Sequence, residues 1–273
     1  MSHLSDHINQ LQASVAFSKQ APLFDQLYGA NSVIAYKRKR VREHILKYAN
    51  PGSSMLELNC GTGEDALFFA EKGFSIHATD ISNEMLSRLD QKLKSSDFKK
   101  NISSEHCSFI ELESLNNKGP FDVIFSNFGG LNCSGELDEV LYKLKPLVKP
   151  GGVITLVIIS NFCLWETLLV FKGKFKTAFR RFFSKNGRKA HLEGHHFKCW
   201  YYSPSFIKNI LEKDFALLDI EGLCTIVPPS YIENFGEKYP GLYSFLERKE
   251  NSLKSKWPWK YIGDYFIISF KKK

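Results

Sequence analysis

The sequence predicts an α/β fold in which a largely parallel sheet is covered by helices on both faces. Three observations lead to this prediction. Short apolar segments alternate with amphipathic ones over residues 50–160. The first apolar segment, residues 55–59, runs into a glycine-rich turn that ends at Gly63. The last one, residues 153–159, is apolar at nearly every position, which is typical of a strand buried on both faces.

The elements can be predicted in order along the chain. Residues 1–50 are expected to form a polar helical cap, because apolar side chains recur at helical spacing between Val33 and Leu46. Ser82 is a typical N-cap of the amphipathic helix that follows it. The predicted strands are residues 55–59, 75–79, 107–110, 121–126, 153–159, 215–223 and 265–270, and the predicted later helices are residues 137–148, 204–213 and 230–250.

The alternation of strands and helices stops after Ser160. Residues 161–200 hold nine Lys or Arg against two acidic residues, which accounts for most of the net charge of +8. We therefore divide the chain into an N-terminal helical cap (1–50), a core (51–160 and 201–273) and a basic, aromatic insertion (161–200) that is expected to be a helical lid.

The composition excludes several classes of protein. The 273 residues are 43% hydrophobic, 14% aromatic and 24% charged, so disordered, collagenous and coiled-coil chains are excluded. The longest apolar run is too short to span a bilayer, and residues 1–31 lack the apolar stretch of a signal peptide, so we expect a cytoplasmic protein. The six cysteines are far apart, which predicts free thiols and no metal site built from them.

The glycine-rich turn indicates a nucleotide site. A turn of this kind between a strand and a helix presents backbone N–H groups and lets a ligand approach the main chain. Gly61, Gly63 and Ala66 have the spacing of a dinucleotide fingerprint, and Asp80 ends the next strand, where it could bind ribose hydroxyls. The spacing alone leaves NAD or FAD as an option, and Asp80 alone could serve as a helix N-terminal carboxylate.

Five motifs in register make a more specific prediction. They are residues 55–63 (MLELNCGTG), 80–85 (DISNEM), 109–115 (FIELESL), 121–127 (FDVIFSN) and 144–152 (LKPLVKPGG). Together they resemble the class I S-adenosylmethionine-dependent methyltransferases. Residues 24–31 and 263–268 are similar to a branch of that family that acts on small molecules.

This resemblance implies a Rossmann-like, doubly wound seven-stranded sheet whose last strand is antiparallel, with S-adenosyl-L-methionine as cofactor and S-adenosyl-L-homocysteine as product. It places Glu57, Asn59, Gly61, Gly63 and Asn127 around the methionine part of the cofactor, Asp80 on the ribose, and Ile81, Met85, Glu111 and Leu112 around adenine, with Tyr28 from the cap. Two positions depart from the family pattern, because Asn59 replaces a common glycine and Glu111 a common aspartate.

The insertion holds the densest group of titratable side chains, His191, His195, His196 and Cys199. Three interpretations compete for it: a metal site, a general base at His195 or His196, and solvated histidines in a lid. Gly194 interrupts the helical spacing, and no second cysteine is near, so we predict no metal and assign the candidate catalytic role to His195 and His196.

The basic aromatic stretch 165–185 also has several interpretations. It could cover an acidic substrate, contact a membrane peripherally, face RNA, or pack as an ordinary cap with a solvated basic face. Our leading hypothesis is methylation of a small and partly apolar acceptor, with oxygen as the expected methylated atom. The basic lid would also suit an acceptor that is acidic. There are three alternatives: an RNA or protein methyltransferase that docks through the basic segment, a NAD-binding oxidoreductase, and a cofactor-binding scaffold without turnover. Nucleic acid is disfavoured, because the sequence has no recognisable RNA-binding module.

Overall fold

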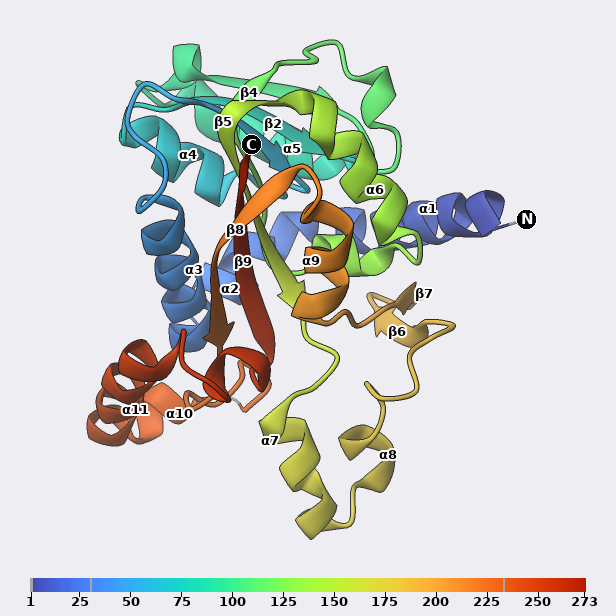
Figure 1. Cartoon of the computed structure of the whole chain (residues 1–273), viewed down its shortest axis with the longest axis vertical. Coiled ribbons are helices and arrows are strands. Elements are labelled where there is room, and N and C mark those ends of the chain that lie inside the picture. Colours follow the sequence, from blue (N-terminus) through green and yellow to red (C-terminus); the bar gives the residue numbers. More distant parts are fainter. Residues whose placement is uncertain (1, 30, 233) are drawn as a thin grey trace.

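The computed structural model describes residues 2–29, 31–232 and 234–273 (Figure 1). A seven-stranded sheet has the strand order β3-β2-β1-β4-β5-β9-β8, and β9 runs antiparallel to both of its neighbours. The predicted doubly wound sheet with an antiparallel last strand is thus confirmed. The strands are β1 (Ser54–Leu58), β2 (Ser75–Asp80), β3 (Ile102–His106), β4 (Phe121–Ser126), β5 (Val148–Ile159), β8 (Phe215–Leu223) and β9 (Tyr265–Lys272).

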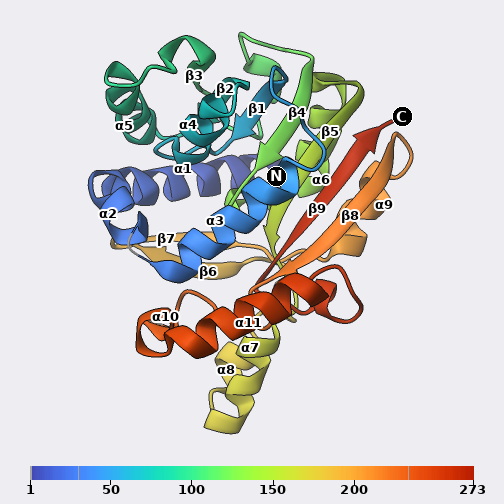
Figure 2. The same ribbon diagram turned by 90° about the vertical axis from the view of Figure 1, so that its left-hand side faces the viewer.

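Helices cover both faces of the sheet (Figure 2). Alternate residues of each strand enter different cores, as in β1, where Met55 joins one apolar cluster and Leu56 the other. One face carries α3 (Ser32–Ile45), α4 (Glu64–Glu71) and α5 (Asn83–Lys94), and the other carries α6 (Leu137–Leu144) and α9 (Pro204–Leu211). A further pair of helices, α10 (Phe235–Lys238) and α11 (Pro240–Leu253), precedes β9.

The predicted strand at residues 107–110 is wrong, because β3 lies earlier, at Ile102–His106. It is an edge strand with only its first residue fully buried, so its sequence is polar. The apolar residues Cys107 and Phe109 belong to the turn that follows it, where both are buried.

The N-terminal cap consists of α1 (Ser2–Gln20), a short turn of 3-10 helix (Ala21–Leu23), α2 (Phe24–Gly29) and α3. Helix α1 crosses the carboxyl ends of the strands. Its Ser14 hydroxyl donates to the Ile81 carbonyl (3.2 Å), and the Asn9 amide donates to the Cys133 carbonyl (2.7 Å). These bonds fix α1 over the edge of the sheet at which ligands of open α/β sheets bind.

The expectation of a helical insertion is only half correct. Its first part forms α7 (Leu164–Thr167), a 3-10 turn (Leu168–Lys172) and α8 (Phe175–Ala178), but Arg188–Leu192 (β6) and His195–Cys199 (β7) form an antiparallel hairpin. Glu193 and Gly194 both have positive φ (48° and 79°), the conformation of a two-residue hairpin turn. The helical spacing of the histidines was therefore accidental.

All six cysteines are free and buried. Within the described part of the chain, no helix combines the length and the hydropathy needed to cross a bilayer.

Candidate functional site

A pocket lies where the carboxyl ends of β1, β2 and β4 meet α1. The strand ends and the turns after them contribute Glu57, Asn59, Cys60, Gly61, Thr62, Asp80, Ile81, Ser82, Met85, Phe109, Asn127, Phe128, Gly130 and Cys133, and the cap contributes Gln10, Ala13, Ser14, Phe17, Phe24 and Arg38, with Glu64 and Asp65 from α4. Seven of the residues predicted to bind the cofactor therefore line one pocket: Glu57, Asn59, Gly61, Asp80, Ile81, Met85 and Asn127.

The glycine-rich turn adopts left-handed backbone angles at Asn59, Gly61 and Gly63 (φ 48°, 56° and 78°). Asn is the residue that best replaces glycine in that region, which explains its presence at position 59. A Cβ on Gly61 would meet no atom within 4 Å, so the turn faces open space there. A Cβ on Gly63 would lie 2.2 Å from Leu89 Cδ1, so Gly63 serves helix packing and does not line the pocket.

Asp80 is buried and tied to the turn. Its Oδ2 accepts from the Gly61 N–H (2.9 Å), and its Oδ1 accepts from the Ser82 N–H (2.8 Å). Burial raises the pKa of this carboxyl, while the two backbone donors oppose that rise. Ser82 in turn accepts from the Met85 N–H (3.2 Å) as the N-cap of α5, as predicted.

Glu57 is the most perturbed acid of the pocket. It is 2% exposed, and its Oε2 has no hydrogen-bond partner among the described residues. Burial, followed by the negative charge of Asp65, holds the pKa of Glu57 well above its usual value. An unpartnered buried carboxyl oxygen beside an open glycine turn suits a ligand that brings a hydrogen-bond donor or a positive charge.

Asp65, at the start of α4, also lines the pocket and contacts three polar side chains. It accepts from Arg42 Nε (2.7 Å) and Asn127 Nδ2 (2.7 Å), and Arg38 Nη1 lies 3.2 Å from its Oδ2. The sequence interpretation did not single out Asp65 or Arg38, because their contact depends on how the cap packs against the core.

Four predicted cofactor residues do not line this pocket. Gly63 packs under Leu89, as described above. Glu111 is half exposed and bonds to His7 (3.1 Å), Leu112 is buried in the hydrophobic core, and Tyr28 lines a neighbouring groove and donates to Gln20 (3.2 Å). The turn after β3 presents Phe109 to the pocket, so the adenine roles predicted for Glu111 and Leu112 are not supported by their placement.

The histidines of the insertion also lie outside the pocket, which none of the described residues 161–200 lines. His191 and His196 face each other across the hairpin with ring centroids 4.8 Å apart, and His195 flanks the turn. The hairpin supports α1: the ring of Phe197 packs 5.9 Å from that of Phe17, which does line the pocket. The catalytic prediction for His195 and His196 is thus not supported by their placement, since a general base must reach the reacting proton.

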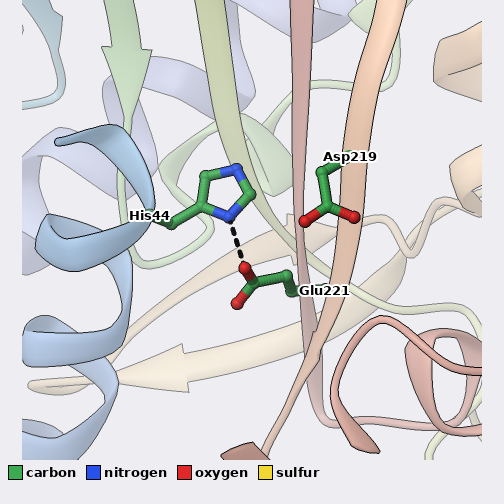
Figure 3. Close-up of side chains that lie close together, drawn as sticks. All are labelled: His44, Asp219 and Glu221. Carbon is green, nitrogen blue, oxygen red and sulfur yellow. Dashed lines mark ion pairs between the residues drawn. The ribbon is translucent and has the colours of Figure 1, made fainter. Parts of the chain in front are cut away.

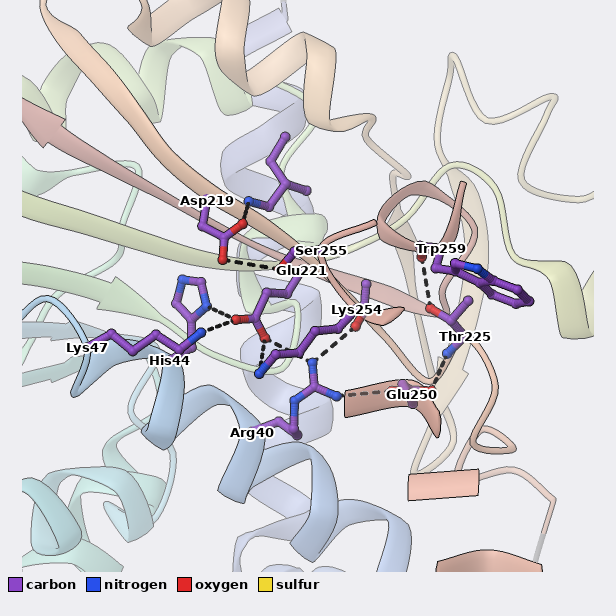
Figure 4. Close-up of polar contacts among 12 residues, drawn as sticks. Arg40, His44, Lys47, Asp219, Glu221, Thr225, Glu250, Lys254, Ser255 and Trp259 are labelled. Carbon is purple, nitrogen blue, oxygen red and sulfur yellow. Dashed lines mark hydrogen bonds and ion pairs between the residues drawn. The ribbon is translucent and has the colours of Figure 1, made fainter. Parts of the chain in front are cut away.

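Within the described ranges, the one group of side chains arranged like metal ligands is His44, Asp219 and Glu221 (Figure 3). Glu221 already faces four cationic or donor groups (Figure 4): Arg40 (2.9 Å), Lys254 (3.2 Å), Lys47 and His44 Nδ1 (2.9 Å). These contacts, chiefly the His44 bond, hold the pKa of Glu221 below its usual range against its burial. A cluster so rich in positive charge repels a cation, so we interpret it as an ionic tie between α3, β8 and α11.

Fold and pocket together define a class I methyltransferase architecture, with the ligand pocket at the carboxyl ends of the first strands. The family model described as "Methyltransferase domain" matches residues 49–195, more than half of the chain. The chain belongs to this family and is an S-adenosylmethionine-dependent methyltransferase.

Related proteins and solved structures agree with the assignment to the methyltransferases. Demethylmenaquinone methyltransferase from Listeria welshimeri is 30% identical over 181 residues, which are 62% of this chain and 73% of that protein. An uncharacterized methyltransferase from Synechocystis is 26% identical over 47% of this chain, and the match spans only 58% of that protein. In structure, 1,6-didemethyltoxoflavin-N1-methyltransferase from Burkholderia thailandensis, with bound S-adenosylhomocysteine, aligns over 98% of this chain and 90% of its own, with a TM-score of 0.57 and 14% identity.

Proposed function

We propose that the enzyme methylates an oxygen of a small, partly apolar acceptor that carries a negative charge. The observation that carries this proposal is the ammonium of Lys37. Lys37 as a whole is 3% exposed, and among the described residues its ammonium forms no ion pair. The ammonium lies 4.6 Å from the ring centroid of Tyr265 and 5.4 Å from that of Phe128, and it donates a long hydrogen bond to Ser230 (3.4 Å). A buried cation without a carboxylate is costly unless a ligand compensates it.

The surroundings of Lys37 suit an apolar acceptor. The ring of Phe128, whose centroid is 5.4 Å from the ammonium, lines the pocket together with Phe17 and Phe24. Phe128 has a φ of 50°, which is strained for a bulky residue and is typical of functional sites. The guanidinium of Arg38 lies 5.0 Å from the same ring. Aromatic walls with two cations against the ring of Phe128 favour an acceptor that joins an apolar body to an anionic oxygen.

The cofactor half of the pocket fits S-adenosylmethionine. Glu57 offers an unpartnered carboxyl oxygen for the ammonium of the cofactor, the turn at Gly61 leaves room for close approach, and Asp80 offers remaining acceptor capacity to ribose hydroxyls. Ile81, Met85 and Phe109 offer apolar surface for adenine. When bound, the cofactor supplies a methyl group on a positively charged sulfur.

The role of this chain in the reaction is alignment and exclusion of water. Helix α1 covers the pocket, so the reacting groups would meet away from bulk solvent. An oxygen that arrives as an anion needs no general base, which agrees with the position of His195 and His196 outside the pocket. A neutral alcohol would instead require a base, and no histidine lines the pocket within the described residues.

The other candidate functions have less support. The family assignment favours a methyltransferase over a NAD-dependent oxidoreductase and over a scaffold without turnover. A macromolecular acceptor would have to enter a pocket that α1 covers, and the basic insertion does not line it. A small-molecule acceptor therefore agrees better with the pocket than RNA or protein does.

The test begins with a metabolite extract, separated by anion exchange and incubated with enzyme and isotope-labelled methyl donor. We expect label to enter compounds of the anionic fraction. With the acceptor found, Lys37→Met should raise its KM at least about tenfold, the loss expected when a nearby anion is deprived of an unpaired buried cation. Lys39→Met is the control, because Lys39 is exposed on the same helix and pairs with Glu43. Labelling confined to neutral compounds, or an unchanged KM in Lys37→Met, would refute the anionic acceptor.

A further inference from the structure

The first half of the insertion forms a lobe, residues 164–186, that projects from the body of the molecule (Figures 1 and 2). Its short helices α7 and α8 are held together by a buried centre. Glu166 accepts from Arg180 Nε (2.8 Å) and Arg181 Nη2 (2.6 Å), and Arg181 also bonds to Asp264 (2.5 Å) at the start of β9. The lobe is therefore a rigid extension of the core, and none of its residues lines the pocket described above.

The outer surface of the lobe is unusually apolar. Phe171 is 87% exposed and Phe183 is 71% exposed. Four more large apolar side chains of the lobe are exposed as well: Leu168, Phe175, Phe179 and Phe182. Single apolar side chains on a surface are ordinary, but a group of six in one small lobe marks an interaction site.

The same surface carries positive charge only. From Thr167 to Leu192 the sequence contains no Asp or Glu. Lys172, Lys174, Lys176 and Lys185 are exposed, and in the described residues none of them forms an ion pair. The arginines at the centre are already paired with Glu166, so the four lysines are the charges available to a partner.

The apolar surface continues beyond the lobe onto α11. A groove between them is lined almost entirely by apolar side chains, among them Trp165, Leu168, Phe245 and Leu253. Leu242, on the same helix, is 49% exposed. The lobe and this face of α11 thus offer one extended apolar surface, bordered by the lysines of the lobe.

We propose that this surface docks on a phospholipid bilayer that contains anionic lipids. Exposed Phe and Leu with Lys around them are the pattern of an interfacial membrane contact, in which rings enter the headgroup boundary and ammonium groups meet lipid phosphates. Single-stranded RNA favours a groove that follows its backbone, whereas these phenylalanines occupy a projecting tip. An acidic protein partner would explain the lysines but not so many exposed rings. The inference is independent of the acceptor proposed above.

Vesicle flotation of the full-length protein tests the proposal. We expect it to float with vesicles of phosphatidylcholine and phosphatidylserine and to stay behind with phosphatidylcholine alone. Two combined variants should each lower the partition coefficient at least about tenfold. One combines Phe171→Ser with Phe183→Ser, and the other combines Lys172→Glu, Lys174→Glu and Lys176→Glu. Lys94→Glu, Lys99→Glu and Lys100→Glu form the charge-matched control, because these exposed lysines lie at the end of α5 and in the turn before β3, away from the lobe (Figures 1 and 2).

A depth measurement separates docking from simple charge attraction. All native cysteines are buried, so an environment-sensitive dye can be attached to Phe171→Cys, with Tyr142→Cys as the exposed control on α6. Vesicles should shift the emission of the dye to the blue at position 171 and leave it unchanged at position 142. The proposal is overturned if the parent ignores anionic vesicles, if the lobe variants bind as the parent does, if the dye shows no shift, or if single-stranded RNA binds to the lobe and vesicles do not.

Discussion

The backbone N–H of Gly61 donates to Oδ2 of Asp80 over 2.9 Å, which ties the glycine-rich turn after β1 to the end of β2. Because the other oxygen of Asp80 accepts from Ser82, one carboxylate fixes the turn and the start of α5 at once. The two walls of the pocket are therefore set relative to each other by a single side chain.

Gly63→Ala should destabilise the fold more than a glycine replacement in a turn usually does. A Cβ at this position would lie 2.2 Å from Leu89 Cδ1, and the φ of 78° is itself unfavourable for alanine. We expect a loss of about 2–4 kcal/mol in the free energy of unfolding, from overpacking and backbone strain together. Chemical denaturation measures it. Combined with Leu89→Ala, Gly63→Ala should cost less stability than it does alone, because the shorter side chain makes room for the new Cβ. Strictly additive losses would contradict the packing role of Gly63.

Glu57→Gln should change how stability depends on pH. The raised pKa means that the folded protein holds a proton on Glu57 that the unfolded chain has released, above the ordinary value of 4.5. Stability of the parent therefore falls as pH rises from 4.5 toward the raised pKa, by up to about 1.4 kcal/mol per pH unit. Glutamine has no proton to release in this range, so the variant should gain stability relative to the parent as the pH rises above 4.5. Parallel pH profiles of unfolding would refute a proton on Glu57.

Arg181→Met should destabilise the protein by about 3–5 kcal/mol, because it leaves the buried Asp264 carboxylate without its cation. Lys176→Met, an exposed position of the same lobe, should stay within about 0.5 kcal/mol of the parent. Thermal and chemical unfolding measure both. Equal stability of the two variants would contradict the buried ion pairs that hold the lobe to β9.

His195→Gln and His196→Gln should each leave kcat within about twofold of the parent, since both histidines lie on the hairpin outside the pocket. Phe197→Ala, next to them, should instead weaken binding of S-adenosylhomocysteine, because its ring supports α1 through Phe17. Steady-state rates and equilibrium binding distinguish the two effects. A loss of about 100-fold in kcat in either histidine variant would restore the general base.

The core of the fold could be predicted from the sequence because its signals are local. Strands buried on both faces have nearly continuous apolar sequences, and Ser82 caps its helix with its own side chain. Asp80 and Met85 could be predicted to lie at the pocket for the same reason, because Asp80 ends β2 and Met85 follows the N-cap residue of the next helix.

The errors have physical causes that a single sequence hides. The edge strand β3 is polar because its exposed side needs no apolar residues, so the apolar turn at Cys107 and Phe109 was taken for the strand. The contacts of α1, Arg38 and Lys37 depend on long-range packing, which leaves no periodic pattern in the sequence.

The central claim, that the pocket between the Gly61 turn and Asp80 binds the cofactor, is tested most directly by calorimetric titration with S-adenosylhomocysteine. We predict saturable binding at one site in the parent, and at least about tenfold weaker binding in Asp80→Asn, which keeps the shape of the side chain but loses its charge. NAD should neither bind nor compete. Unchanged affinity in a folded Asp80→Asn variant, or displacement of S-adenosylhomocysteine by NAD, would contradict the assignment of this pocket.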